Sequence, residues 1–172
     1  MTDSDSVGRL ESSLGGIPID LLINSAGVLG PERQSTSDMD FEGFAEVLAV
    51  NTLGPLRVTQ ALTPALINSG QGKVAVITSR MGSLSYAKSD TVAYRASKAA
   101  ANKVTQCLAT DLGSLGVIVA ALHPGWVRTN IGGQEAEIDT ATSATGIVTL
   151  LQGLTMKDTG RFWNYDGSPL AW

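Results

Sequence analysis

The strongest constraint on the fold is an alternation of short apolar runs with longer segments that have helical periodicity. Three runs, IDLLINSA, KVAVITS and VIVAALHP, are almost continuously apolar, which is typical of parallel strands buried on both faces. They occupy residues 19–26, 73–79 and 117–124. A shorter run, RFWNY, predicts a fourth strand at residues 161–165. The segments that alternate with the strands are long enough for helices, and they are residues 38–69, 92–115 and 140–152.

This alternation predicts an α/β fold. Strands that alternate with helices form βαβ units and therefore a mostly parallel sheet, here of about four strands. Right-handed crossovers place the helices on both faces of such a sheet, which gives a three-layer, Rossmann-like sandwich. A chain of 172 residues is expected to form a single domain over residues 1–172. Ser37 is a candidate N-cap for the helix at residues 38–69.

Polar residues follow the ends of the predicted strands. Ser79 closes the second strand, and Tyr94 and Lys98 begin the helix that comes after it. A tyrosine and a lysine four residues apart share one face of any helix, so this pair alone is weak support for a site. The carboxyl ends of parallel strands meet at one edge of the sheet, and ligands bind in the crevice there. The sequence therefore predicts that these side chains converge.

Five motifs occur in order along the chain: NSAG, NTLG, ITSRMGS, YRASK and PGWVRT. In this order and spacing they resemble the short-chain dehydrogenase/reductase family, and the resemblance covers almost the whole chain. The phrase SRMGS and the tail GRFWNYDGSPLAW are similar to its carbonyl-reductase-like or C-factor-like branch. The resemblance implies a Rossmann-like sheet whose four strands correspond to family strands 4 to 7.

The resemblance also implies an oxidoreductase that transfers hydride between NAD or NADP and a small carbonyl compound or alcohol. Tyr94 would be the general acid/base, and the Lys98 charge would favour its phenolate and hold the nicotinamide ribose. Ser79 would donate a hydrogen bond to the substrate oxygen. Asn51, from the long helix between the first two strands, would hold a water in a proton relay.

A cofactor-binding set is implied in the same way. Gly27 would permit close backbone approach, Asn24 would tie neighbouring strands together, and Thr129 with the backbone near Val127 would fix the nicotinamide amide. The full set implied is Asn24, Ala26, Gly27, Lys98, Pro124, Gly125, Val127 and Thr129.

One family element has no counterpart in this sequence. The family begins with a strand, a Gly-rich turn and a helix that together bind the pyrophosphate, and nothing before residue 19 matches this pattern. We therefore expect only the nicotinamide half of the cofactor site, with NAD or NADP binding weak or lost. The strand at residues 19–26 would then be a sheet edge. We expect a homodimer or tetramer, formed through this edge, through the helices of Asn51 and Tyr94, or through both. The edge would be covered by the twofold-related copy or by a rearranged N-terminal segment.

Composition limits the other partners. The net charge is −4 with no basic cluster, so we expect neither nucleic acid nor an anionic membrane as a partner. No apolar run is long enough to span a membrane, and the acidic first residues do not form a signal peptide. Cys107 is the single cysteine, which is consistent with a reducing cytoplasm. No His/Cys/Asp cluster suggests a metal site.

Three hypotheses about function follow from the sequence. The first is the oxidoreductase just described, acting through Ser79, Tyr94, Lys98 and Asn51. The second is a non-catalytic descendant of the family that binds or assembles and keeps these residues as relics. The third is the product of a truncated reading frame without a selected function. Cofactor binding separates the first from the other two.

Overall fold

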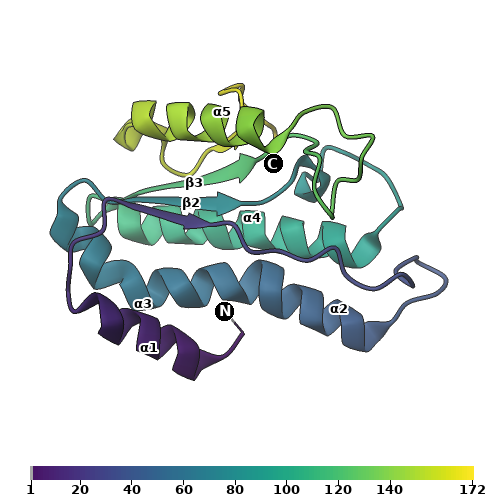
Figure 1. Ribbon diagram of the computed structural model, residues 1–172, viewed down its shortest axis with the longest axis horizontal. Coiled ribbons are helices and arrows are strands. Elements are labelled where there is room, and N and C mark those ends of the chain that lie inside the picture. Colours follow the sequence, from purple (N-terminus) through teal and green to yellow (C-terminus); the bar gives the residue numbers. More distant parts are fainter. Residues whose placement is uncertain (1) are drawn as a thin grey trace.

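A computed structural model describes residues 2–172 and shows an α/β fold built on one four-stranded parallel sheet (Figure 1). The strands lie in the order β1-β2-β3-β4, and each pairs in parallel with its neighbour. Their bounds are Leu21–Asn24 (β1), Lys73–Ile77 (β2), Ile118–His123 (β3) and Phe162–Asn164 (β4). The prediction of a parallel, Rossmann-like sheet of about four strands is confirmed.

Helices cover both faces of the sheet, as predicted (Figure 1). Helix α5 lies alone on one face, whereas α2, α3 and α4 lie on the other, and α1 packs against α3. The helix bounds are Ser4–Leu14 (α1), Phe41–Leu48 (α2), Gly54–Ser69 (α3), Val92–Gly113 (α4) and Thr140–Gly153 (α5). Three short helical turns complete the fold: Ala49–Leu53 (η1), Arg80–Gly82 (η2) and Met156–Asp158 (η3).

Two apolar clusters form the core, one on each face of the sheet. Successive side chains of a strand point to opposite faces, so β3 contributes to both. Val119 packs with Leu66 of α3, while Leu122 packs with Leu151 of α5. All four are almost fully buried. The sheet is thereby fixed between its helices, and this arrangement positions the loops at its carboxyl edge.

β1 is an edge strand that is only half covered. Within residues 2–172, β2 is the only strand that pairs with it. Leu22 packs against the core, but Leu21 and Ile23 are each 40% exposed. Burial of residues 19–26 on both faces was therefore a wrong prediction, because α5 packs over β2 and β3 instead. The expected exposed edge is present.

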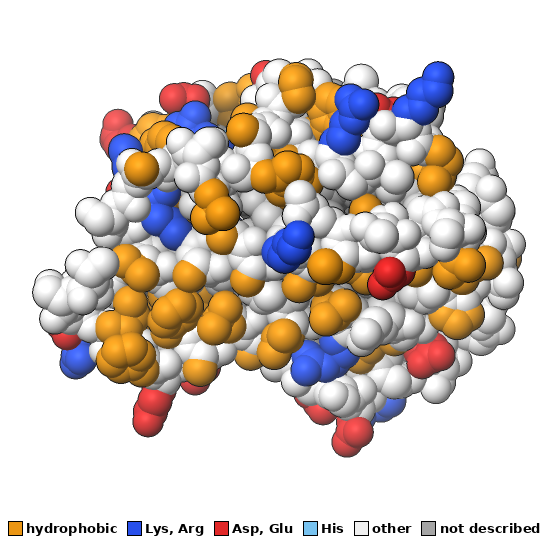
Figure 2. Space-filling model, turned by 180° about the vertical axis from the view of Figure 1, so that it is seen from behind, with side chains coloured by type: hydrophobic (Ala, Val, Ile, Leu, Met, Phe, Trp, Pro, Cys, Tyr) orange, Lys and Arg blue, Asp and Glu red, His pale blue; other side chains and the backbone are white. Residues whose placement is uncertain are grey.

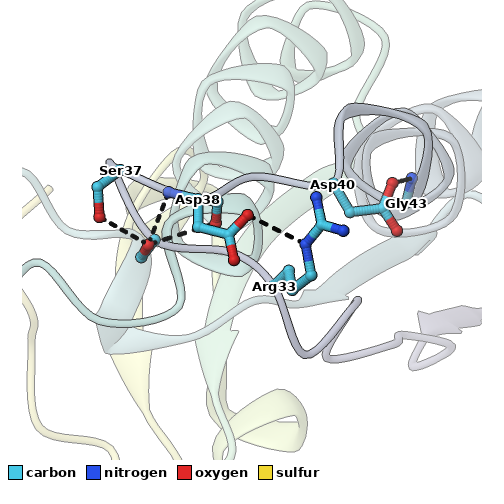
Figure 3. A network of polar contacts seen from close by, with 6 residues as sticks. Arg33, Ser37, Asp38, Asp40 and Gly43 are labelled. Atoms are coloured by element: carbon cyan, nitrogen blue, oxygen red, sulfur yellow. Dashed lines mark hydrogen bonds and ion pairs between the residues drawn. The ribbon is translucent and has the colours of Figure 1, made fainter.

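The long helical segment starts later than predicted, at Phe41 rather than after Ser37. Asp40 is the N-cap, and its carboxylate accepts a hydrogen bond from the Gly43 amide at 2.9 Å (Figure 3). Ser37 instead interacts with the hydroxyl of Ser35. The segment then runs from α2 through the π-helical turn η1 into α3 without a break. No helix in the described part of the chain has the length and apolarity needed to cross a membrane.

Candidate active site

A cleft of about 910 Å³ lies at the carboxyl edge of the sheet. Its walls come from the loops that follow β1, β2 and β3 and from the first turns of α4 and α5. Most of the predicted site residues line it. They are Gly27, Ser79, Tyr94, Lys98, Pro124, Gly125, Val127 and Thr129.

Ser79, Tyr94 and Lys98 share one wall of the cleft and are all almost buried, with 6%, 8% and 4% of their surface exposed. Lys98 lies one helical turn after Tyr94, and its Nζ is 5.6 Å from the centre of the tyrosine ring. The same Nζ donates a hydrogen bond to the Ile77 carbonyl at 3.0 Å. Ser79 lies two residues after the end of β2, and its hydroxyl accepts a hydrogen bond from the Met81 amide at 3.1 Å.

Burial dominates the electrostatics of this wall. It raises the pKa of Tyr94, and a hydrogen bond with the Ser79 side chain partly offsets the rise. Burial also lowers the pKa of Lys98 to about 8. The Tyr94 phenol therefore holds its proton near neutral pH, while Lys98 remains mostly charged. In this state the wall presents a phenolic O–H donor beside a buried cation.

Asn51 lies behind the cleft wall, within η1. Its side-chain amide donates to the Val28 carbonyl at 2.9 Å and to the Ser97 hydroxyl at 3.0 Å, and it accepts from the Val28 amide at 2.9 Å. Both N–H donors are thus used by the protein itself. Gly27 lies directly in front, where an added Cβ would come within 3.3 Å of both Asn51 Oδ1 and Lys98 Nζ. Glycine therefore allows the backbone after β1 to approach these two side chains.

Two residues of the predicted cofactor set are outside the cleft. Asn24 is buried and its Nδ2 donates to Thr59 Oγ1 in α3 at 3.2 Å. The Asn24 side chain thus joins β1 to α3 rather than joining two strands, because it points to the face of the sheet that α3 covers. Ala26 is exposed and does not line the cleft.

Gln34 positions Tyr94, and no sequence pattern pointed to it. Its Oε1 accepts a hydrogen bond from the Tyr94 amide at 3.1 Å, and its main-chain carbonyl accepts one from the Val92 amide. Its Nε2 donates to the carbonyls of Leu29 and Pro31. This buried side chain therefore connects the loop after β1 to the first turn of α4, where the free amides of a helix need acceptors.

The loop after β3 is held in place by hydrogen bonds of its own. The Ser143 hydroxyl of α5 donates to the Pro124 carbonyl at 2.6 Å. Gly125 has a φ of +85°, and an added Cβ there would lie 2.6 Å from Ile138 Cδ1. Trp126 Nε1 donates to the Gly132 carbonyl, so the indole closes the loop and lines the cleft. The Thr129 hydroxyl accepts from the Gly132 amide within the same loop.

Two features of the cleft lining suit a bound dinucleotide. Lys98 Nζ has three donors, of which one is used by the Ile77 carbonyl within residues 2–172, and Gly27 leaves its backbone open to close approach. Among the described residues only α1 precedes β1. The start of α1 could offer free backbone amides to a phosphate. Two of these amides already donate hydrogen bonds to the Asp3 carboxylate. Among residues 2–172 no group of three or more His, Cys, Asp or Glu could hold a metal ion.

A parallel Rossmann-like sheet with serine, tyrosine and lysine in one wall of its cleft is the arrangement of a dehydrogenase/reductase domain. Residues 4–139 match the family model for short chain dehydrogenase. The chain belongs to the short-chain dehydrogenase/reductase family, an oxidoreductase family whose structures include complexes with NADPH and NADP.

Individual relatives place it in the carbonyl-reductase-like branch. C-signal of Myxococcus xanthus is 42% identical over 157 residues, covering 90% of this chain and 93% of that protein. The 1-hydroxy-2-glutathionyl-2-methyl-3-butene dehydrogenase of a Rhodococcus strain is 36% identical, covering all of this chain and 77% of that enzyme. The NADPH-bound carbonyl reductase from chicken fatty liver superposes with a TM-score of 0.92 at 32% identity, covering 99% of this chain and 74% of that one.

Proposed function

We propose that the chain catalyses hydride transfer between NAD or NADP and a small carbonyl compound or alcohol. The observation that carries this proposal is the shared position of Ser79, Tyr94 and Lys98 in one buried wall of the cleft, with Lys98 Nζ 5.6 Å from the Tyr94 ring. Two of these groups have pKa values shifted by burial, which is common where side chains take part in proton transfer.

Each residue of the wall has a separate role in the proposal. Ser79 donates a hydrogen bond to the substrate oxygen as charge develops there. Tyr94 gives its proton to that oxygen during reduction and takes it back during oxidation. Lys98 supplies a positive charge that stabilises the phenolate left behind. Because Val28 and Ser97 take both N–H donors of the Asn51 side chain, we assign Asn51 to positioning the wall rather than to donating to a relay water.

The cofactor, when bound, supplies the hydride. Lys98 would hold its nicotinamide ribose, while Gly27 and the segment from Pro124 to Thr129 would border the ring. The pyrophosphate contacts that the family makes through its Gly-rich turn have no counterpart in the described residues before β1. Losing several charge-assisted hydrogen bonds of about 1.5–3 kcal/mol each lowers affinity by orders of magnitude. We therefore propose that this chain binds NADH and NADPH weakly.

A second candidate is a non-catalytic protein that acts by binding or assembly. The match to C-signal favours it, because a relative named as a signal aligns with this chain over 93% of its own length. This candidate predicts that the cleft residues are relics and that reduced cofactors do not bind.

We also propose self-association into a homodimer or tetramer. The free edge of β1 exposes Leu21 and Ile23, and an uncovered apolar edge favours pairing with another chain. Helices offer a second surface: Figure 2 shows hydrophobic side chains gathered on the face opposite to that of Figure 1. Phe41 of α2 and Leu53 of η1, near Asn51, are 78% and 46% exposed.

Calorimetric titration with NADH and NADPH, run beside an aldehyde-reduction assay, tests the proposal. We expect dissociation constants from roughly 0.1 mM to several mM, together with slow turnover at high cofactor concentration. No heat and no turnover at millimolar cofactor would favour the non-catalytic protein. Binding of NADH or NADPH with a dissociation constant in the low micromolar range would contradict a site that keeps only the nicotinamide half.

A further inference from the structure

Three cations surround one tyrosine in the cleft. The guanidinium carbons of Arg80 and Arg95 lie 5.6 and 5.5 Å from the centre of the Tyr86 ring, and Lys88 Nζ lies 5.7 Å from it. All four residues line the cleft. The chain is acidic overall and has only 12 lysines and arginines in 172 residues. The gathering of three cations around one ring is therefore a local feature. We call Arg80, Lys88 and Arg95, together with the ring that they surround, the Tyr86 cation cluster.

The charge of this cluster is only partly neutralised. Arg95 pairs with the Asp90 carboxylate, with Arg95 Nε donating to Asp90 Oδ1 at 2.8 Å. Arg80 and Lys88 form no ion pair with another described residue. All three cations lie within 5.7 Å of the same ring centre, so their like charges repel, and the repulsion falls when an anion binds beside them. The cluster therefore has positive charge available for a ligand.

Arg95 has one guanidinium nitrogen without a partner. Its Nε and Nη2 are bonded to Asp90, whereas Nη1 is buried and makes no hydrogen bond. The Arg95 side chain is 11% exposed. A buried donor without an acceptor costs free energy. Because Nη1 is closed to a ligand in this arrangement, Arg95 contributes to the cluster through its positive charge.

The cluster adjoins the proposed catalytic residues directly. Arg80 follows Ser79 in the chain, and Arg95 follows Tyr94. Much of the remaining cleft is apolar, with Met81, Trp126 and Ile147 among its lining. A largely apolar cleft with a few charged groups at one place suits a ligand that has an apolar body and one charged group.

We propose that the Tyr86 cation cluster binds an anionic group, a carboxylate, on an apolar carbonyl substrate. This inference rests on the proposed reductase function, since it names the substrate class of the same cleft. The Ser79 and Tyr94 hydroxyls would meet the carbonyl oxygen, and Arg80, Lys88 and Arg95 would meet the carboxylate. A phosphate of a nucleotide has similar anionic oxygens, so the test must separate the two sources.

The test measures equilibrium binding by calorimetry, without turnover. The probes are 4-carboxybenzaldehyde and the longer 4′-formylbiphenyl-4-carboxylate, each compared with its neutral methyl ester. We expect at least one acid to bind about tenfold tighter than its ester, with a preference that falls as salt is added. Lys88→Gln and Arg80→Gln, both at exposed side chains, should each reduce that preference about threefold or more. Lys103→Gln, an exposed lysine of α4 outside the cleft, is the matched control.

Each outcome decides the proposal. Equal binding of acid and ester in both pairs would overturn it, as would a preference that survives the Arg80→Gln, Lys88→Gln double variant. A third probe, 2′-phospho-ADP-ribose, covers the nucleotide: if the variants weaken it and leave the acids unchanged, the cluster holds a phosphate and the proposal is wrong. If the acids bind through the cluster but are never reduced, the site stands and the reductase function fails.

Discussion

The side-chain carbonyl of Gln34 accepts a hydrogen bond from the Tyr94 amide at 3.1 Å. Gln34 comes from the loop after β1, and Tyr94 lies in the first turn of α4, so this bond joins two segments that are 60 residues apart. The general acid of the proposed reaction is therefore positioned by a buried amide that itself never enters the cleft.

The first prediction concerns this bond. Gln34→Met keeps the length of the side chain but removes the acceptor for Tyr94 and the donor for Pro31 and Leu29. We expect the free energy of unfolding in urea to fall by about 1–3 kcal/mol and kcat to fall more than KM rises. Gln34→Glu, which keeps the acceptor, should restore part of the activity. Gln71→Met at an exposed position is the control, and an equal effect there would refute a specific role for Gln34.

The second prediction concerns the buried charge of Lys98. Burial lowers its pKa from 10.5 to about 8, so between these values the unfolded chain binds more protons than the folded one. Stability should therefore rise with pH across this window because of Lys98, by at most about 1.4 kcal/mol per pH unit. Below pH 8 the group is charged in both states, and its full desolvation cost is present.

Comparing wild type with Lys98→Met isolates this contribution. The difference in free energy of unfolding, wild type minus variant, should increase by roughly 2 kcal/mol between pH 7.5 and 9.5, measured by urea denaturation. Tyr94, whose raised pKa acts in the opposite direction above pH 10, lies outside this range. A difference that stays constant with pH would show that Lys98 titrates normally.

The third prediction concerns the far end of the sheet. Lys73 Nζ donates to the carbonyls of Leu151, Gln152 and Leu154 at the end of α5, at 2.7, 3.3 and 3.1 Å. Lys73→Met removes both the donors and a cation that favours a helix C-terminus, so we expect a loss of about 1–3 kcal/mol of stability. Lys73→Arg should recover part of it. Since the cleft is at the opposite edge, KM values should not change, and altered KM would contradict this separation.

The fourth prediction concerns self-association. Leu21→Lys places a charge on the free edge of β1, where the native side chain is 40% exposed and outside the cleft. If copies pair through this edge, sedimentation should show dissociation to monomers with an unchanged circular dichroism spectrum. Phe41→Lys tests the helical surface in the same assay. The variant that dissociates the oligomer identifies the interface. A wild-type chain that stays monomeric at high concentration would contradict self-association through either surface.

Sequence patterns predicted the sheet and the grouping of Ser79, Tyr94 and Lys98 for a physical reason. A continuously apolar run such as residues 117–124 is typical of a strand covered on both faces, although the similar run at residues 19–26 is half exposed. The carboxyl ends of parallel strands necessarily converge. This convergence brings Ser79, at the end of the second strand, and the start of the next helix, with Tyr94 and Lys98, to one edge of the sheet. The grouping of these residues thus follows from topology.

Other features could not be predicted, because they depend on local competition or on tertiary contacts. Ser37 and Asp40 are both good N-caps, but Ser37 interacts with Ser35, and the loop's ion pair joins Asp38 to Arg33 (Figure 3). In a four-residue strand, alternation alone does not say that Asn24 faces α3. No motif or hydrophobic periodicity in the sequence indicates that Gln34 positions Tyr94.

Deuterium transfer from 4-deuterated NADPH to 4-carboxybenzaldehyde, followed by mass spectrometry of the alcohol, tests the central claim most directly. We predict that the wild-type chain, at millimolar cofactor, gives deuterated alcohol. Tyr94→Phe should lose at least about 100-fold in rate while keeping its fold and its cofactor affinity. Unchanged transfer by Tyr94→Phe, or no transfer by the wild type with cofactor bound, would contradict the assignment of this cleft as a reductase site.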